Sequence, residues 1–466
     1  LFEYMKKDTI AAISTGMTNS GIGIVRISGA DAFATADRVY RGKYRISEMK
    51  SHTIHYGHIE DHGNVIDEVL ISVMRGPGTF TGEDTVEINC HGGTFVVSKV
   101  LETVLRNGAR PAEPGEFTKR AFLNGKMDLS QSEAVIDVIT SKNDYALKSS
   151  LSQLKGSLKN KINDIRNKII YNTAFIESAL DDPEHISLEG YGERLRVECK
   201  EIQKELEKLI SSSADGKIMK EGIQTVIVGK PNAGKSSLLN VLAGQERAIV
   251  TDIEGTTRDA LEEQIQLKGI NLNIIDTAGI RQTEDVVEKL GVDRAKEYAR
   301  NADLIVYVVD SSRNLDENDE KILELIYDKK TIILLNKSDL ETVTTKETVE
   351  EKIRRMSSGH VGDIPMIEIS AKDENGIEQF ADTVKSMFLG GDIRFNEEIY
   401  ITNARQKSAL SDALESMRKV TESIDAGIPE DFYSIDLMDA YESLGSITGE
   451  SVGEDLVNEI FSKFCM

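Results

Sequence analysis

The sequence is poor in cysteine and lacks a long apolar run. Its 466 residues include three cysteines, Cys90, Cys199 and Cys465, which lie far apart. This scarcity excludes a disulfide-stapled scaffold and a paired-cysteine zinc site, and it is typical of a reducing cytosol. No stretch approaches the ~18 consecutive apolar residues of a membrane span, and the first residues show no secretory signal pattern. We therefore expect a cytoplasmic protein without a membrane segment.

Basic residues are also in short supply. Lys and Arg number 56 against 79 Asp and Glu, so the formal net charge is −23. Residues 391–466 alone carry 6 basic and 16 acidic side chains. Because phosphate contacts need clustered Lys and Arg, this chain is not a default nucleic-acid binder. A polyanion would have to meet a local basic patch or a partner protein.

Enough apolar sequence is present for several cores. Hydrophobic residues make up 39% of the chain, and at roughly 150 residues per domain its length predicts about three domains. Short β-rich runs at 23–27, 69–73 and 86–89 alternate with glycine-rich turns, and a helix candidate follows at 96–107. These runs predict an N-terminal α/β domain.

Two helical stretches flank a strand-rich stretch. Apolar residues recur every three or four positions from Leu147 to Ile169, which predicts one long amphipathic helix that ends near Pro183. The same spacing returns from Leu410 to Ile424. Between them, apolar runs alternate with helical segments, which predicts a mostly parallel, doubly wound sheet. The expected strands lie at 225–228, 272–275, 304–309, 331–335 and 366–369.

The order of these stretches predicts one helical domain interrupted by an inserted α/β domain, because the ends of a domain often lie close together. The expected boundaries are 1–124 for the N-terminal domain, 125–218 and 391–466 for the two parts of the helical domain, and 219–390 for the inserted domain.

Residues 229–236, Gly-Lys-Pro-Asn-Ala-Gly-Lys-Ser, match the GxxxxGK[ST] pattern between a strand and a helix. Backbone N–H groups of such a loop surround phosphate oxygens, Lys235 reaches the β/γ phosphates, and the Ser236 hydroxyl ligates magnesium. Asn232 is a neutral oxygen donor that could hold a monovalent cation, or else an ordinary turn residue. The motif predicts a nucleotide site.

Further motifs follow at the expected strand ends, where ligands bind in such sheets. Residues 256–259, Thr-Thr-Arg-Asp, lie in the segment where a switch threonine would complete the magnesium shell, and Asp276 could hold magnesium through water. The Asp339 carboxylate can accept from guanine N1–H and its amine, a pattern that adenine does not offer, so GTP is favoured over ATP. Ile280 stands where small signalling GTPases carry a water-orienting glutamine. The GTP-binding residues expected from these motifs are Asn232, Ala233, Gly234, Lys235, Ser236, Ser237, Thr256, Thr257, Asp276, Thr277, Ala278, Gly279, Asn336, Lys337, Asp339, Ser370, Ala371 and Lys372.

These motifs resemble the MnmE (TrmE) family of tRNA-modification GTPases over nearly the full chain. Within the inserted domain the resemblance is carried by 229–237, 248–259 and 276–281. Outside it, the matching segments are 8–12, 23–29, 80–84, 90–93, 114–118, 122–129 and 460–465.

The resemblance implies a homodimer formed through an N-terminal domain that binds a 5-formyl-tetrahydrofolate-type cofactor. Arg26, Glu83 and Lys126 would contact the folate; without the family each would be interpreted as an ordinary surface charge. The resemblance also implies potassium-stimulated GTP hydrolysis, with Glu288 orienting the water network. The resemblance adds Thr251, Asp252, Ile253, Glu254 and Gly255 to the GTP-binding residues. The metal ligands that it implies are Asn232, Thr251, Ile253 and Thr256 for potassium, and Ser236 and Thr257 for magnesium.

The implied reaction is modification of C5 of the wobble uridine (position 34) of tRNA, together with an FAD-dependent partner protein. The family ends Phe-Cys-Ile-Gly-Lys, and its terminal lysine is counted among the folate contacts. This sequence ends Phe464-Cys465-Met466, either by natural change or by truncation, so the terminal-lysine contact is expected to be absent from it. Cys465 is a possible functional thiol, although a cysteine without a nearby base is more often inert. A ribosome-assembly GTPase switch is the alternative function, which the acidic tail disfavours. A dynamin-like membrane GTPase is disfavoured because no basic amphipathic segment occurs.

Overall fold

A computed structural model describes residues 8–245, 263–275, 302–325, 329–356, 364–389, 399–450, 452–462 and 464. The chain divides into two units, each assembled from separate stretches of sequence. The first comprises residues 1–139, 151–203 and 409–466, and the second comprises residues 140–150 and 204–408. The predicted fold class, in which an α/β domain is inserted into a helical one, is confirmed.

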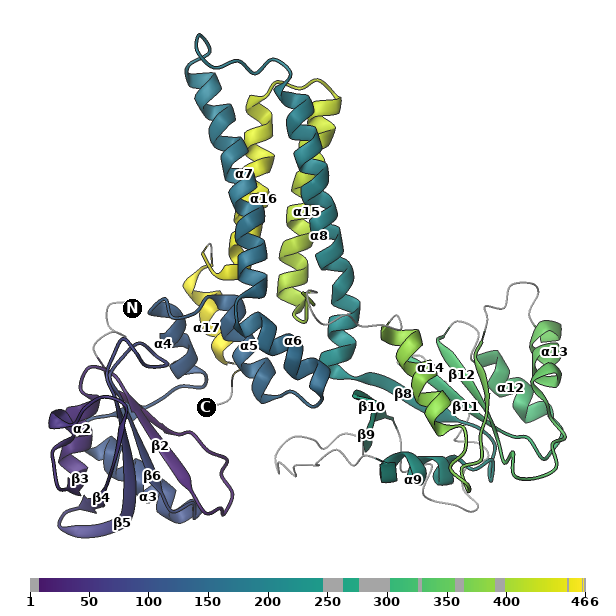
Figure 1. The fold of residues 1–466 in the computed structure, drawn as a ribbon, viewed down its shortest axis with the longest axis horizontal. Coiled ribbons are helices and arrows are strands. Elements are labelled where there is room, and N and C mark those ends of the chain that lie inside the picture. The colour runs from purple at the N-terminus through teal and green to yellow at the C-terminus, as the bar shows by residue number, and fades with distance from the viewer. Residues whose placement is uncertain are drawn as a thin grey trace. The chain divides into compact units, whose positions relative to one another are not determined.

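A seven-stranded sheet forms the N-terminal part of the first unit (Figure 1). Its strand order is β3-β4-β5-β6-β2-β1-β7, and its neighbours are antiparallel except for the parallel pair β1–β7. The strands are β1 (Ile10–Ile13), β2 (Gly23–Ser28), β3 (Tyr40–Gly42), β4 (Thr53–Asp61), β5 (Asn64–Met74), β6 (Thr85–Cys90) and β7 (Arg110–Pro111). The predicted runs correspond to β2, β5 and β6, whereas the other four strands were not predicted.

Helices cover the two faces of this sheet unequally. On one face, α2 (Ala32–Val39) and α3 (Thr94–Arg106) bury Val39 and Val100 against inward residues such as Ile27 and Ile71. On the other face, Phe117 of α4 (Glu116–Leu123) packs over Ile10 of β1. A short 3-10 helix, η1 (Ile46–Glu48), precedes β4. The second face therefore stays exposed over β4 and β5, where Tyr56 and Leu70 point outward.

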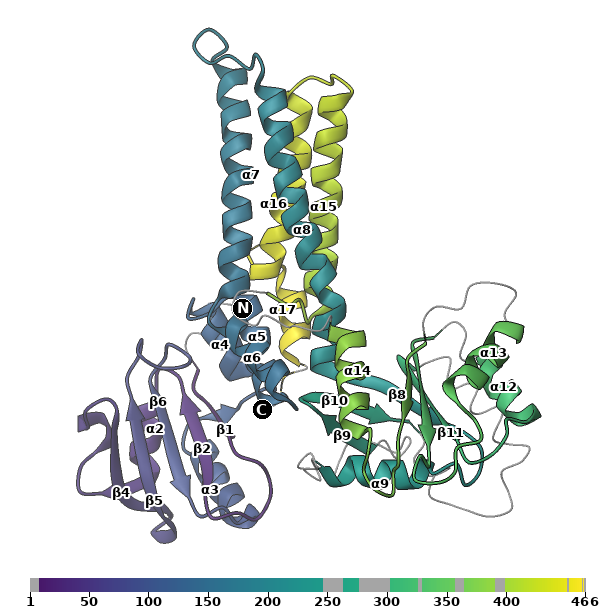
Figure 2. The same cartoon turned by 45° about the vertical axis from the view of Figure 1, so that its right-hand side comes forward.

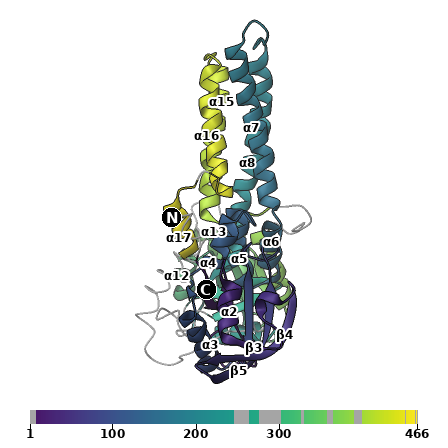
Figure 3. The same ribbon diagram turned by 90° about the vertical axis from the view of Figure 1, so that its left-hand side faces the viewer.

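The rest of the first unit is helical, and α7, α8, α15 and α16 run alongside one another (Figures 2 and 3). Apolar residues of α7 pack against α16, and the Gln203 Nε2 of α8 donates to the Met417 carbonyl of α15 at 2.8 Å. The two parts of the predicted helical domain thus contact each other. The helices that lie within the first unit are α5 (Leu129–Ile139), α7 (Ser157–Asp181), α16 (Asp431–Thr448) and α17 (Glu454–Ser462). Helices α8 (Tyr191–Glu221) and α15 (Ala404–Asp425) extend into the second unit, to which most of α6 (Asp144–Leu154) belongs.

One prediction about these helices is wrong. The stripe from Leu147 to Ile169 does not form a single helix, because Gly156 adopts a left-handed φ of 91° and separates α6 from α7. Glycine has no Cβ to oppose this conformation, so a break there costs little. The predicted stop is confirmed, since α7 ends at Asp181.

The second unit contains a six-stranded sheet in the order β13-β12-β11-β8-β10-β9. The first five strands in this order pair in parallel, and β9, which was not predicted, joins the edge antiparallel to β10. The strands are β8 (Ile223–Val228), β9 (Glu263–Leu267), β10 (Ile270–Ile274), β11 (Leu304–Asp310), β12 (Thr331–Asn336) and β13 (Met366–Glu368).

Helices lie against this sheet (Figure 1), and separate apolar cores fill its two faces. One is shared with α9 (Lys235–Gln245) and α14 (Ile377–Leu389), and the other with α12 (Glu317–Leu325) and α13 (Lys346–Met356). Successive residues of β8 divide between them, Ile227 in the first core and Val228 in the second. The described helices include none with the length and hydropathy of a membrane span.

Candidate functional site

The phosphate loop connects the end of β8 to the start of α9 at Lys235. Asn232 and Gly234 take positive φ angles of 61° and 97°. A Cβ at Gly234 would collide with the Asn336 side chain, so only glycine fits there. The loop thus curls closely before the helix begins, and it directs the first N–H groups of α9 toward a site for anions.

Lys235 has no anionic partner among the contacts that the structure describes for it. Its Nζ donates to the backbone carbonyl oxygens of Gly229 and Lys230 at 2.7 and 2.8 Å. Burial lowers the pKa of Lys235 to about 8, because two neutral carbonyls compensate little of the lost hydration. A phosphate in this loop would supply the missing negative charge.

Asn336, at the end of β12, joins three of the predicted motifs. Its Nδ2 donates to the Ala233 carbonyl of the phosphate loop at 2.8 Å, and its Oδ1 accepts from the Ala371 N–H at 3.0 Å. The side chain is buried, so both bonds are shielded from water. The structure therefore brings the phosphate loop, 336–339 and 370–372 together.

The neighbours of Asn336 are fixed by side-chain contacts as well. Lys337 adopts a positive φ of 67°, and its Nζ lies 2.7 Å from the Asp310 carboxylate at the end of β11. The Asp339 carboxylate accepts from the Ser370 hydroxyl at 3.0 Å, while Asp339 itself remains exposed. An exposed carboxylate held in this way can accept hydrogen bonds from a base.

An ion pair that sequence reasoning missed connects the phosphate loop to α12. The Lys230 Nζ lies 2.6 Å from Asp319 and 3.0 Å from Asp316, and the buried Tyr307 hydroxyl donates to Asp319 at 2.7 Å. Burial would lower the pKa of Lys230, but the bonds to Asp319 and Asp316 outweigh it and raise that pKa. Lys230 occupies a variable position of the phosphate-loop motif, and no motif marks Asp316, Asp319 or Tyr307, because they belong to separate segments.

Other predicted residues of the nucleotide site have a simpler placement. Ser236 and Ser237 lie in the first turn of α9, Ala233 is buried in the loop, and Lys372 is exposed. The remaining predicted residues lie outside the described ranges, namely Thr251, Asp252, Ile253, Glu254, Gly255, Thr256, Thr257, Asp276, Thr277, Ala278, Gly279, Glu288 and Cys465.

The three predicted folate contacts come from adjoining parts of the N-terminal sheet and its α4 side. Arg26 projects from β2 beside Glu87, at 2.8 Å, with its guanidinium 5.5 Å from the centre of the Phe117 ring. Glu83 lies in the β5–β6 loop, and the Lys126 Nζ donates to the Pro77 carbonyl of that same loop at 2.9 Å. A pair of cations with one carboxylate suits a ligand that carries both acidic groups and N–H donors.

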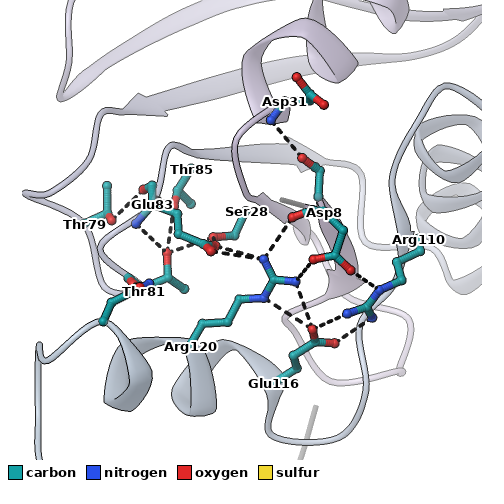
Figure 4. Close-up of polar contacts among 12 residues, drawn as sticks. Asp8, Ser28, Asp31, Thr79, Thr81, Glu83, Thr85, Arg110, Glu116 and Arg120 are labelled. Carbon is teal, nitrogen blue, oxygen red and sulfur yellow. Dashed lines mark hydrogen bonds and ion pairs between the residues drawn. The ribbon is translucent and has the colours of Figure 1, made fainter. Parts of the chain in front are cut away.

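Glu83 belongs to an ionic network that is buried at Arg120 and Glu116 and partly exposed at Asp8 and Arg110 (Figure 4). Arg120 of α4 contacts the carboxylates of Glu83, Glu116 and Asp8, and Arg110 contacts those of Asp8 and Glu116. Burial would raise the pKa values of Asp8 and Glu116, but hydrogen bonds from the two arginines hold both below their ordinary values. The i,i+4 spacing of Glu116 and Arg120 was the one sequence signal for this network.

Comparisons with known proteins agree with this architecture. A family model described as the MnmE helical domain matches residues 129–465, and one described as the N-terminus of the GTP-binding protein TrmE matches residues 9–126. A tRNA modification GTPase MnmE of Lachnoclostridium phytofermentans is 57% identical over 99% of this chain and 100% of its own length. Proteins of the same name from Acetivibrio thermocellus and Clostridioides difficile are 50% and 48% identical, over 99% and 98% of this chain and 99% of their own lengths.

The inserted sheet and its phosphate loop define a P-loop nucleotide-binding domain of the GTPase type. With its N-terminal and helical domains, the chain belongs to the MnmE (TrmE) family of tRNA modification GTPases.

Proposed function

We propose that this protein hydrolyses GTP in order to modify C5 of the wobble uridine (position 34) of tRNA in the cytoplasm. The observation that carries the GTPase part is the buried Asn336, which bonds to the phosphate loop and to Ala371 while Asp339 stays exposed beside them. The names of the relatives, tRNA modification GTPase, support the tRNA part.

In this proposal each described motif has one task. The Asp339 carboxylate accepts from guanine N1–H and its amine, and Ser370 keeps that carboxylate oriented at 3.0 Å. The Lys235 ammonium exchanges its hydrogen bonds to the Gly229 and Lys230 carbonyls for contacts with the β and γ phosphates. Glu288 would orient the attacking water, since Ile280 offers no group for this purpose.

The metal ions belong to the proposal too. Ser236, in the first turn of α9, would ligate magnesium together with Thr257. Asn232 is exposed in the phosphate loop, and its amide oxygen would hold potassium together with Thr251, Ile253 and Thr256. Potassium would supply positive charge near the bridging oxygen between the β and γ phosphates.

We further propose that the N-terminal domain binds a 5-formyl-tetrahydrofolate-type cofactor as the source of a one-carbon unit. Arg26 and Lys126 suit the glutamate carboxylates of a folate, and Glu83 suits the N–H groups of its pterin. The placement of Glu83 and Lys126 on one loop supports this assignment. An FAD-dependent partner protein would complete the modifying complex.

The exposed face of the N-terminal sheet supports the proposed homodimer. Ile54 and Tyr56 of β4 are 67% and 59% exposed, and Leu70, which pairs with Tyr56 across the strands, is 49% exposed. A contiguous apolar patch on a sheet face is typical of an interface. Tyr56→Glu should shift the mass measured by light scattering toward the monomer, whereas Tyr44→Glu, an exposed tyrosine outside this face, should not.

The proposed function is tested by nucleoside analysis of tRNA from a strain that lacks this protein. The parent chain should restore the modified wobble uridine, and Lys235→Ala should not. An unmodified uridine with the parent chain would contradict the proposal. Cosedimentation with ribosomal subunits would instead favour the alternative, a ribosome-assembly GTPase switch. None of the contacts described above supports that alternative.

A further inference from the structure

Arg120 is enclosed by the N-terminal domain (Figure 4). It is 2% exposed, and all three of its nitrogens bond within the network. The Nη1 donates to the two Glu83 oxygens at 3.1 and 3.2 Å and to the Asp8 carbonyl at 3.0 Å. The Nε and Nη2 donate to Glu116 at 3.3 and 3.0 Å, and Nη2 also donates to Asp8. Arg120 therefore has no N–H left to offer a ligand.

The Glu83 carboxylate, unlike the Arg120 guanidinium, does not have all of its hydrogen-bonding positions filled. Its Oε2 accepts from the Ser28 hydroxyl at 2.8 Å in addition to the bond from Arg120, and its side chain is 15% exposed. Two carboxylate oxygens offer about four acceptor positions, of which these bonds occupy three. One acceptor position of this partly exposed carboxylate therefore remains for an N–H group of a ligand.

The loop that carries Glu83 is fixed at its backbone too. The Thr79 hydroxyl donates to the Glu83 carbonyl at 2.7 Å, and the Glu83 N–H donates to the Thr81 hydroxyl oxygen at 3.2 Å. Directly after α4, the Asn124 side chain donates to the Thr81 carbonyl at 2.7 Å. Since the backbone is fixed independently, Arg120 is needed for the direction of the carboxylate rather than for the path of the loop.

The net charge of the network also favours a ligand that donates hydrogen bonds to Glu83. Three carboxylates meet two guanidiniums, so one negative charge is left over. Arg110 contacts Asp8 and Glu116, and among the described ion pairs Arg120 is the cation that reaches Glu83. The surplus negative charge therefore favours a ligand that presents N–H donors to Glu83.

We propose that Arg120 is a positioning residue of the folate site, which holds the Glu83 carboxylate in the orientation that receives the pterin N–H groups. This inference rests on the proposed folate function of Arg26, Glu83 and Lys126. Arg120 acts only through Glu83, whereas Arg110, which shares its other two carboxylates, has no part in ligand binding.

The test is calorimetric titration of the full chain with 5-formyl-tetrahydrofolate. Glu83→Gln and Arg120→Lys should each weaken binding about tenfold, the effect of one charge-assisted hydrogen bond. The double variant should bind no more than about twofold more weakly than Glu83→Gln alone. Both substitutions remove the same interaction, the hydrogen bond between a correctly oriented Glu83 carboxylate and the ligand, so their effects should not add. Arg110→Lys, the matched control, should stay within about twofold of the parent.

A purely structural Arg120 would give a different pattern. Arg120→Lys would then weaken binding equally with and without Glu83→Gln, or Arg110→Lys would weaken it as much, and either result overturns the positioning role. If the parent chain does not bind this folate, or if Arg26→Ala, Glu83→Gln and Lys126→Ala all bind it as tightly as the parent, the proposed folate site itself fails. Weak binding by those three variants together with unaltered binding by Arg120→Lys would overturn the positioning role alone.

Discussion

Lys235 and Arg120 are two buried cations whose neighbouring groups differ in charge. The ammonium of Lys235 faces two backbone carbonyls, and burial lowers its pKa to about 8. Burial would also lower the pKa of the Arg120 guanidinium, but the carboxylates of Glu83, Glu116 and Asp8 raise it instead. The phosphate loop thus carries an uncompensated charge, whereas the network around Arg120 compensates its cation internally.

This difference separates a residue that binds from a residue that positions. An uncompensated buried charge costs free energy in the folded state, and an anionic ligand recovers part of that cost. A fully bonded arginine has nothing to gain from a ligand, but the side chains bonded to it depend on it. The same substitution, a buried cation replaced by methionine, should therefore have opposite consequences at the two positions.

The largest expected effect is on stability. Arg120→Met leaves three carboxylates without their shared cation and should cost about 3–5 kcal/mol of unfolding free energy in the first unit. Lys235→Met removes a poorly compensated charge and should leave the stability of the second unit unchanged or higher. Hydrogen exchange of amides in α4 and α9 of the full chain measures the two effects separately. Equal losses at both positions would contradict the comparison.

Base recognition should follow from Asp339. Asp339→Asn turns an acceptor toward the guanine N–H groups into a partial donor, so GTP binding should weaken by about 1.5–3 kcal/mol. Xanthosine triphosphate, whose base presents an acceptor at that position, should bind better than it does to the parent. Calorimetry with both nucleotides measures the exchange of preference, and unchanged GTP affinity would remove 336–339 from the base site.

Potassium should act on hydrolysis and not on binding. Hydrolysis is expected to be at least about tenfold faster in potassium than in sodium at matched ionic strength, since a correctly placed charge stabilises the transition state. Asn232→Ala should flatten this response while GTP affinity changes little. Equal turnover in the two salts would leave Asn232, with its φ of 61°, as an ordinary turn residue.

These contrasts also explain what the sequence could predict. Each of the motifs at 229–236, 336–339 and 370–372 consists of consecutive residues that can be recognised in the sequence. A parallel sheet brings its strand ends to one edge, so the contacts of Asn336 with the other two motifs could be expected. The partners of Arg120 lie 4, 37 and 112 residues away. No local pattern reveals such a cluster, because the packing of α4 on the sheet creates it. The same limit applies to the helix break at Gly156, where one residue outweighs an uninterrupted apolar stripe.

Acid should weaken the network around Arg120. The pKa values of Asp8 and Glu116 lie below their ordinary values of 3.8 and 4.5, so the unfolded chain takes up protons before the folded one does. Stability is therefore fully present above about pH 4.5 and is lost as the pH falls toward the folded-state values, by roughly 1.4 kcal/mol for each pKa unit of lowering at the buried Glu116. Asp8, which is partly exposed, contributes less because water screens its ion pairs. Denaturation from pH 6 to pH 3 measures the slope, which Glu116→Gln should reduce. A slope that Glu116→Gln leaves unaltered would contradict this assignment.

The smallest effect concerns the charge on Lys235 in the absence of nucleotide. With its pKa near 8, this ammonium is partly neutral above pH 8, and phosphate binding must restore the proton. GDP affinity should therefore fall between pH 7 and pH 9, toward about tenfold per pH unit at the upper end. Calorimetry in buffers with different ionisation enthalpies should detect the uptake of up to about one proton at pH 9. Asp339→Asn, titrated with xanthosine diphosphate, should keep the same slope, because the described contacts of the Lys235 ammonium do not include Asp339. A flat profile would mean that Lys235 is already fully charged, and the contrast between the two cations would then lie in their neighbours alone.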